Sequence, residues 1–243
     1  MGTLFLQPAN LFLYVLDVLL RSYLIFVGTV MSHEGTHGHL GRTKYANLWW
    51  GRLALAPSLV PYTNFRRTHR LHHAYTNVPD MDPDHFMNAR HVLELPLRAV
   101  AMPHQWFFWL WKRGRIRLED LVELALNYAG LLAIWLVMFW FIGAARLFWG
   151  VVPALIAVSL MLWYPFAFKT HEGFSTGSAE ERSHNYYGRF MYWFSLGLSV
   201  HRAHHMYPQL NWIELKNYVE QAPDSTTWRL LPGRDIQPDS VRT

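Results

Sequence analysis

The sequence predicts an all-α integral membrane protein, a transmembrane helix bundle with a cytoplasmic cap rich in histidine. Two observations carry this prediction. Hydrophobic side chains make up 51% of the 243 residues and gather in long blocks rather than at the spacing of a soluble core. Eight of the 14 histidines lie outside these blocks in three clusters, at 33–37, 69–73 and 201–205.

Three apolar blocks are long enough to cross a membrane, because a hydrocarbon core of about 30 Å takes roughly 20 helical residues. The first covers 11–31 and contains Asp17 and Arg21, whose four-residue spacing allows them to neutralise one another. The second and third cover 121–142 and 147–168. The alternative, buried helices of a soluble protein, would require additional polar helices to cover them, and we identify none.

The short break at 143–146 predicts that the second and third spans form an antiparallel hairpin, whose outer ends share one side of the membrane. The basic run 112–117 directly precedes this hairpin and places that side in the cytoplasm. The interrupted apolar segments 45–62 and 93–111 are expected to lie in the interface or to re-enter the membrane. The prediction is a single domain over 1–243, with its cytoplasmic cap formed by 32–117 and 169–243.

The three histidine clusters have the spacing of metal ligands. Residues three or four apart share one face of a helix, so each cluster is expected to aim two or three imidazoles at one point. Imidazole binds iron, copper, nickel and zinc, but a structural zinc closes with four ligands. The clusters therefore indicate two metals that each keep a position open for chemistry. Their members are His33, His37, His69, His72, His73, His201, His204 and His205.

The chain contains no cysteine, which excludes disulfides, thiolate metal sites and iron–sulfur clusters within it. Glycine-rich nucleotide motifs of the Rossmann or P-loop type are also absent from the sequence. Electrons for any redox chemistry are therefore expected from another protein. The net charge of +5 does not indicate a nucleic-acid partner, because the basic residues flank apolar blocks, where anionic lipid is the better match.

The order His-x3-His, His-x2-His-His, His-x2-His-His, combined with the span layout, resembles the membrane fatty acid desaturase superfamily over nearly the whole chain. Supporting runs follow the second cluster at 72–77 and 82–85 and the third at 204–208. This superfamily holds acyl desaturases, lipid hydroxylases, and carotenoid hydroxylases and ketolases. The resemblance implies a non-haem centre of two irons, dioxygen as co-substrate and a long-chain lipid drawn from the bilayer as substrate.

The resemblance also implies a ninth nitrogen ligand near the cytoplasmic end of the last span. His171 lies at that helix end, and we prefer it to His184, which lies within the cap. His39 is close to the first cluster, but its spacing points it off the shared helix face. Nearby carboxylates are candidates to accept the second ring N–H of a ligating histidine, although an Asp-Pro turn explains the two aspartates equally well. These carboxylates are Glu34, Asp82, Asp84 and Glu172.

The expected function is O2-dependent desaturation or hydroxylation of a long-chain lipid, with fatty acyl desaturation as the leading hypothesis. Carotenoid hydroxylation or ketolation is an alternative, because carotenoid ketolases are similarly compact and carry an acidic residue and a glycine where this chain has Glu34 and Gly38. A membrane metal-binding carrier is the non-enzymatic alternative.

The electron donor is expected to be a ferredoxin-like or cytochrome-like protein. Such donors are typically acidic, and the cytoplasmic side offers cations on which one could dock by electrostatic steering. The run 112–117 is also expected to bind lipid phosphate. The candidate docking residues are Arg66, Arg67, Arg70, Lys112, Arg113, Arg115 and Arg117.

Overall fold

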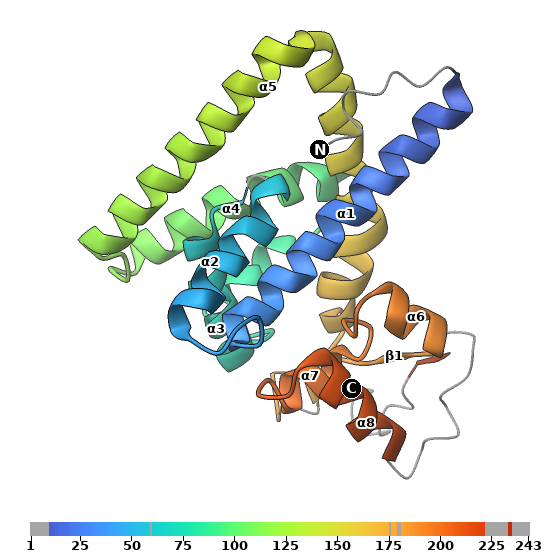
Figure 1. Ribbon diagram of the computed structural model, residues 1–243. Coiled ribbons are helices and arrows are strands. Elements are labelled where there is room, and N and C mark those ends of the chain that lie inside the picture. Colours follow the sequence, from blue (N-terminus) through green and yellow to red (C-terminus); the bar gives the residue numbers. More distant parts are fainter. Residues whose placement is uncertain (1–9, 59, 175, 179–180, 222–232, 235–243) are drawn as a thin grey trace.

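The computed structural model describes residues 10–58, 60–174, 176–178, 181–221 and 233–234, and these are largely helical as predicted (Figure 1). Two short strands, β1 (Tyr186–Tyr187) and β2 (Gly233–Arg234), pair antiparallel with Tyr186 opposite Arg234. The last part of the predicted cap, 222–232 and 235–243, lies outside the described residues. The helices are α1 (Leu11–His37), α2 (Lys44–Leu55), η2 (Ala56–Ser58), α3 (Tyr62–Tyr75), η3 (Pro83–Met87), η4 (Val92–Glu94), α4 (Leu95–Lys112), α5 (Leu118–Val158), η5 (Ser159–Phe168), η6 (Lys169–His171), α6 (Arg189–Phe194), α7 (His201–Met206) and α8 (Trp212–Gln221).

Helix α1 extends beyond the predicted span and carries the first histidine cluster in its last turns. Its start is capped by Asn10, whose side chain accepts a hydrogen bond from the Leu13 N–H at 2.9 Å. It ends at Gly38, which adopts the left-handed conformation at φ 92° and returns its N–H to the carbonyls of Glu34 and Gly35. The helix therefore holds His33 and His37 on rigid backbone.

The chain reverses direction between the second and third apolar blocks, at the predicted break. Gly143 breaks the helical path of α5 with φ 76° and ψ 162°, values that a residue without a Cβ adopts readily. Figure 1 shows the two arms of α5 meeting at the top, and the second arm descends into η5 and η6. The end of this arm, at His171, thus returns to the level of the histidine clusters.

Helix α1 packs against the second arm of the hairpin. The expected pair of Arg21 with Asp17 is present, and Arg21 Nη1 also donates to the Gly150 carbonyl at 2.8 Å. Below this contact, Phe26 and Val158 are completely buried in one apolar cluster that joins the two helices. This packing brings the carboxyl end of α1 beside η5 and η6.

The interrupted segments 45–62 and 93–111 each form shorter helices. Helix α2 has 12 residues and lies along α1, where the Gly28 position is so close to the Ala54 carbonyl that a Cβ would meet its oxygen at 2.3 Å. Helix α4 has 18 residues and contacts α3, η3 and η5. Both helices thus help to enclose the region between α1 and the second arm of α5.

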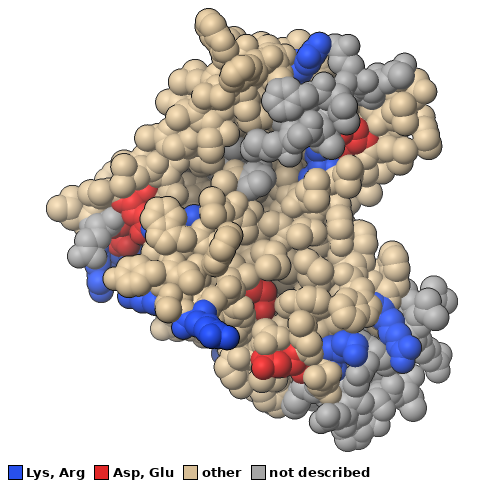
Figure 2. Space-filling view, viewed as in Figure 1, with Lys and Arg blue, Asp and Glu red and all other residues tan. Residues whose placement is uncertain are grey.

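Two helical stretches are long and apolar enough to cross a membrane, Leu11–His37 and Asp120–His171. The second stretch contains both arms of the hairpin. Figure 2 shows that the surface of these arms is almost free of Lys, Arg, Asp and Glu, whereas charged side chains gather toward the lower half of the molecule.

Candidate metal centre

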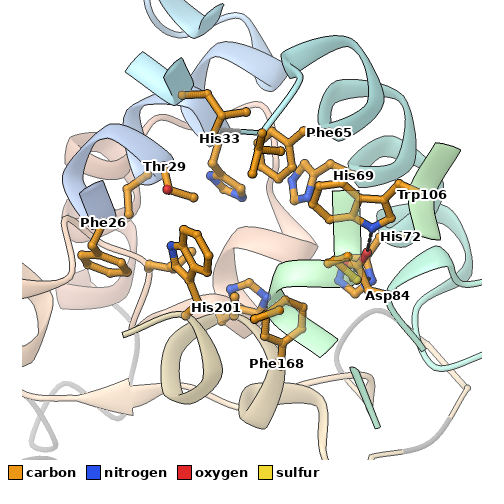
Figure 3. A pocket seen from close by; sticks show the side chains of 18 residues that line it. Phe26, Thr29, His33, Phe65, His69, His72, Asp84, Trp106, Phe168 and His201 are labelled. Carbon is orange, nitrogen blue, oxygen red and sulfur yellow. Dashed lines mark hydrogen bonds and ion pairs between the residues drawn. The ribbon is translucent and has the colours of Figure 1, made fainter. Parts of the chain in front are cut away.

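The structure brings nine of the ten predicted metal-binding histidines together. The first cluster comes from the end of α1, the second from α3, the third from α7, and His171 from η6 at the end of the hairpin. Figure 3 shows four of these side chains, His33, His69, His72 and His201, around the same hollow. Segments far apart in the sequence therefore converge on one place.

The nine side chains form two groups, and within each group the ring nitrogens that could bind an ion lie within 4.8 Å of one another. Group one consists of His33, His37, His69, His73 and His204, and group two of His72, His171, His201 and His205. The groups adjoin, since the rings of His73 and His205 stack with their centroids 4.1 Å apart.

Each His-x2-His-His cluster is divided between the two groups, which corrects the expectation that a cluster converges on one point. In α3, the i and i+4 residues belong to group one and His72 belongs to group two. In α7 the assignment is reversed, with His204 in group one and the i and i+4 residues in group two. Both helices thus join the two groups.

The spacing of the ring nitrogens fits a metal ion in each group. Neighbouring ligands on an octahedral ion, at about 2.1 Å from it, lie about 3.0 Å from one another. In group one the Nε2 atoms of His37 and His69 are 2.9 Å apart, and those of His73 and His204 are 3.1 Å apart. In group two the His171 Nε2 lies 2.8 Å from that of His201. These distances match adjacent corners of a coordination sphere.

Hydrogen bonds at Nδ1 set several imidazoles to present the Nε2 lone pair to the group interior. His171 Nδ1 donates to the Arg182 carbonyl at 3.0 Å, and His205 Nδ1 lies 3.3 Å from Thr76 Oγ1. A ring whose Nδ1 holds the proton keeps Nε2 free to bind a metal. His33 Nε2 is buried with no hydrogen-bond partner among the described residues. A metal ion would satisfy that nitrogen.

Burial keeps five of the histidines in the neutral form that binds metals. Burial and then the neighbouring imidazoles lower the pKa of each of these side chains well below its usual value, because a charged ring would lose its hydration. The five are His69, His73, His201, His204 and His205.

His72 differs because two carboxylates lie behind it. Its Nδ1 donates to Asp82 Oδ1 at 2.9 Å and lies 3.8 Å from Asp84 Oδ2. Burial alone would lower the pKa of His72, but the two carboxylates outweigh burial and raise it to about 9. The two carboxylates therefore favour binding of a cation at the other ring nitrogen, Nε2. This cation can be a proton or a metal ion.

An apolar cavity opens beside both groups. His33 and His69 of group one and His72 and His201 of group two line it. Its wall is otherwise mainly apolar, and the remaining lining residues are Phe26, Thr29, Val30, Leu55, Val60, Phe65, Asp84, Ala99, Met102, Trp106, Trp163, Ala167, Phe168 and Leu198. Figure 3 shows the labelled members around the hollow. A long apolar chain in this cavity would lie directly against the histidines.

Asp84 is the carboxyl group in this cavity wall. Its Oδ1 accepts a hydrogen bond from Trp106 Nε1 at 2.9 Å, the dashed contact in Figure 3. Burial raises the pKa of Asp84 to about 6, although His72 opposes the rise. Asp82, in contrast, is held as an acceptor by the backbone N–H groups of Asn77 and Asp84 as well as by His72.

The other two predicted carboxylates have different surroundings. Glu34 Oε1 lies 3.6 Å from His33 Nδ1, but its Oε2 binds His39 Nδ1 at 3.0 Å. His39 itself is in neither group, as its spacing indicated. Glu172 is exposed and pairs with Lys169 at 3.5 Å, so the expectation that it supports a histidine does not match the geometry. The two residues that follow His171, Glu172 and Gly173, are exposed.

His184 is buried but belongs to neither group. Its ring packs between Phe174, with centroids 5.1 Å apart, and Tyr186, at 4.5 Å. The preferred residue, His171, instead lies within group two, where its Nε2 is 3.1 Å from that of His72.

Three residues at this centre received no role from the sequence, although Thr76 and Asn77 lie in the supporting run 72–77. Thr76 Oγ1 donates to the His72 carbonyl and faces His205, and Asn77 fixes Asp82 through its backbone N–H. Arg182 orients His171 through its carbonyl and reaches the His73 carbonyl with its guanidinium group at 3.2 Å. The position of Thr76 four residues after His72 was the available signal, whereas Arg182 carried none.

Asp82→Asn is expected to lower turnover about 10- to 100-fold, the usual cost of losing a partner that orients a metal-binding histidine. The amide is nearly isosteric but removes the charge behind His72 Nδ1. The matched control is Glu172→Gln, which alters an exposed carboxylate paired with Lys169. Initial rates at saturating substrate check this, and equal rates for the two variants would show that Asp82 does not support the centre.

The comparison with known protein families gives a match over most of the chain. The sequence profile described as fatty acid desaturase matches residues 9–225. No solved structure matches the chain.

Three curated relatives carry desaturase names. The chain is 38% identical over 71 residues to the sn-1 acyl-lipid omega-3 desaturase (ferredoxin) of Synechocystis sp., covering 29% of this chain and 20% of the relative. It is 36% identical over 56 residues to an omega-3 fatty acid desaturase of Caenorhabditis elegans, covering 23% and 14%. It is 28% identical over 118 residues to a Delta(12) fatty acid desaturase of the same organism, covering 40% and 31%.

The aligned segments therefore span less than a third of each of these relatives. The family profile, in contrast, extends from before the first histidine cluster to beyond the third. On the strength of that match, the chain belongs to the fatty acid desaturase family.

Proposed function

We propose that the chain is a membrane oxidoreductase that introduces a double bond into the acyl chain of a lipid, using two irons, dioxygen and an external electron donor. The observation that carries this proposal is the pairing of two histidine groups with one apolar cavity between α1, α3, α4 and η5. Group one would hold one iron and group two the other. Two irons bound in this way supply the redox chemistry with dioxygen that an unactivated C–H bond requires.

The overall reaction balances with two electrons from the substrate and two from the donor. Converting a CH2–CH2 unit to CH=CH releases two hydrogens, and reduction of dioxygen to two waters takes four electrons and four protons. The donor therefore supplies one electron pair per turnover, and two protons come from the solvent. The chain itself contains no cysteine and no nucleotide motif, which supports a separate ferredoxin-like or cytochrome-like donor. One relative carries ferredoxin in its name.

The apolar lining of the cavity supports the view that the protein contributes mainly by positioning the acyl chain. Apolar side chains such as Phe26, Val30 and Leu55 hold an alkyl chain and exclude water, because a chain in this space exchanges water for close packing. His33 and His72 lie at the cavity wall from different groups, so a carbon placed between them faces both metal positions. Orientation of one carbon at the centre then selects the bond that reacts.

The membrane placement is part of the same proposal. The stretches Leu11–His37 and Asp120–His171 would cross the bilayer, and the basic run 112–117 supports a cytoplasmic position for the histidine end. The acyl substrate would then enter the cavity from the bilayer.

Neither alternative is favoured. The three relatives are named as fatty acid desaturases, so carotenoid hydroxylation or ketolation gains no support from them. A metal carrier would need polar side chains along a path between the spans, whereas the space next to the histidines is lined mainly by apolar ones.

The test is acyl-chain analysis of cells that express the protein and of matched cells that express His72→Ala. We expect an additional unsaturated acyl species only with the wild-type chain. A new oxidised pigment without a new acyl species would contradict acyl desaturation.

Purified protein in lipid vesicles tests the donor. Turnover should require a reduced donor protein, and full activity with a nicotinamide alone would refute the external-donor proposal. If the donor docks through surface charge, turnover at limiting donor should also fall as salt rises, because the screening length shrinks to about 8 Å at physiological ionic strength.

A further inference from the structure

A basic hollow lies on the outside of the protein where α3 and the start of α5 meet. We define it by its six cations, Lys44, Arg66, Arg67, Arg70, Arg115 and Arg117, which surround Leu71, Leu110, Asp120 and Glu123. Figure 2 shows charged side chains gathered on the left, near the beginning of α5 in Figure 1. Five of the seven cations expected to receive the electron donor thus line a concave site rather than a flat surface.

The two carboxylates that line the basic hollow do not neutralise its six cations. Its two carboxylates are already engaged, Asp120 with Arg67 and Glu123 with Arg52. Burial, and next the repulsion by Arg70, lower the pKa of Arg66. Arg66 forms no ion pair among the described residues, and Asp120, which pairs with Arg67, offsets this shift only in part. Half-buried cations that repel one another favour binding of an anion.

An apolar groove adjoins the basic hollow, and the two share Glu123. Leu118, Val122 and Leu126 lie four residues apart on one face of α5, and they are 76%, 54% and 69% exposed. Across the groove Trp49 is 60% exposed. Arg52 and Asn127 complete the lining.

We propose that the basic hollow and the apolar groove together bind one anionic glycerophospholipid of the bilayer. Its phosphate would lie among Arg66, Arg70 and Arg115, and one acyl chain would lie along Leu118, Val122 and Leu126. The ligand must combine an anionic head with an apolar chain, because the cationic and the apolar surfaces are contiguous. A free phosphate would leave the groove exposed, and an acidic protein surface would bring charge against its leucines.

The location agrees with a lipid. The groove begins in the first turns of the stretch Asp120–His171, at the end where the chain would enter the membrane. Phosphate groups and the upper acyl carbons are found at that level of a bilayer. The residues of this site are distinct from those of the cavity beside the histidines, so the bound lipid is a second lipid and not the chain that is oxidised. The proposal requires the membrane placement given above but not the reaction.

The test is native mass spectrometry of the full, iron-loaded chain titrated with dioleoyl phosphatidylglycerol, dioleoyl phosphatidylcholine or glycerol phosphate. We expect one phosphatidylglycerol per chain, bound more tightly than either of the other two probes. Arg66→Gln combined with Arg115→Gln should weaken phosphatidylglycerol binding roughly 30-fold, the effect expected for the loss of two cations that face an anionic lipid. Arg90→Gln combined with Arg189→Gln removes the same charge from exposed positions outside the site and should leave binding unchanged.

The groove needs its own variant. Leu118→Ser combined with Leu126→Ser should weaken phosphatidylglycerol binding without changing that of glycerol phosphate. Iron content of each variant verifies the fold independently of lipid.

Three results would overturn the lipid site. One is equal affinity for phosphatidylglycerol and glycerol phosphate, which indicates a free-anion site. Another is equal affinity for the two phospholipids. The third is unchanged lipid binding in the arginine variant together with a raised KM for the donor protein, which would assign the basic hollow to electron-donor docking. Because lipid binding is measured without turnover, loss of the desaturase proposal would leave this test intact.

Discussion

Alanine at His33, His72 or His204 is expected to reduce desaturation to below about one-hundredth of the wild-type rate, since removing even a supporting partner of a ligand costs 10- to 100-fold. His33 and His204 belong to group one and His72 to group two, so the three variants sample both metal positions. Membrane insertion should remain normal, because the long apolar stretches do not depend on these side chains. Product formation per inserted protein measures the effect.

The control is His91→Ala, which removes an exposed histidine that belongs to neither group. It should retain wild-type turnover. If one of the three alanine variants kept substantial activity, the replaced histidine would not be a required ligand. The assignment of a metal to its group would then be wrong.

His171→Ala is expected to lose iron from group two together with activity, whereas His184→Ala should retain both to a large extent. The physical reason is position: His171 Nε2 lies 2.8 Å from His201 Nε2 and 3.1 Å from His72 Nε2. The His184 ring instead packs between Phe174 and Tyr186 and belongs to neither group. Metal content and turnover of the two variants, measured side by side, decide the assignment. If His171→Ala kept the wild-type iron content and His184→Ala lost iron, the ninth ligand would be His184 in the cap.

Much of the helical framework could be predicted from the sequence because its signals are local. The break at Gly143, the pair of Asp17 with Arg21 and the placement of His171 at a helix end all follow from spacing along the chain. The apolar blocks appear as the long helices α1 and α5 for the same reason.

The division of the histidine clusters could not be predicted because it depends on how two helices cross. On a helix, residues i and i+4 are about 40° apart, while i+3 is about 60° away on the other side of i. Any cluster with this spacing can therefore serve one point or two adjacent points. The approach of histidines from α3 and α7, such as His73 and His204 with their Nε2 atoms 3.1 Å apart, gives the second outcome. His72 and His204 are each grouped apart from their neighbours in sequence.

The roles of the carboxylates could not be predicted from local spacing either. Asp82 and Glu172 are both close in sequence to a histidine of group two, yet only Asp82 faces a ring nitrogen. The difference arises from the turn after α3, where Asn77 adopts φ 64° and binds the Asp82 carboxylate with its N–H. After η6 the chain instead directs Glu172 to Lys169 at the surface.

The measurement that tests the central claim most directly is elemental analysis of the purified, active chain. Group one provides five imidazoles and group two provides four, and imidazole is a suitable ligand for iron. The two groups therefore predict about two irons per chain. The ratio should fall when His72 or His204 is replaced. A single, tightly held zinc per chain, with no iron, would contradict the account.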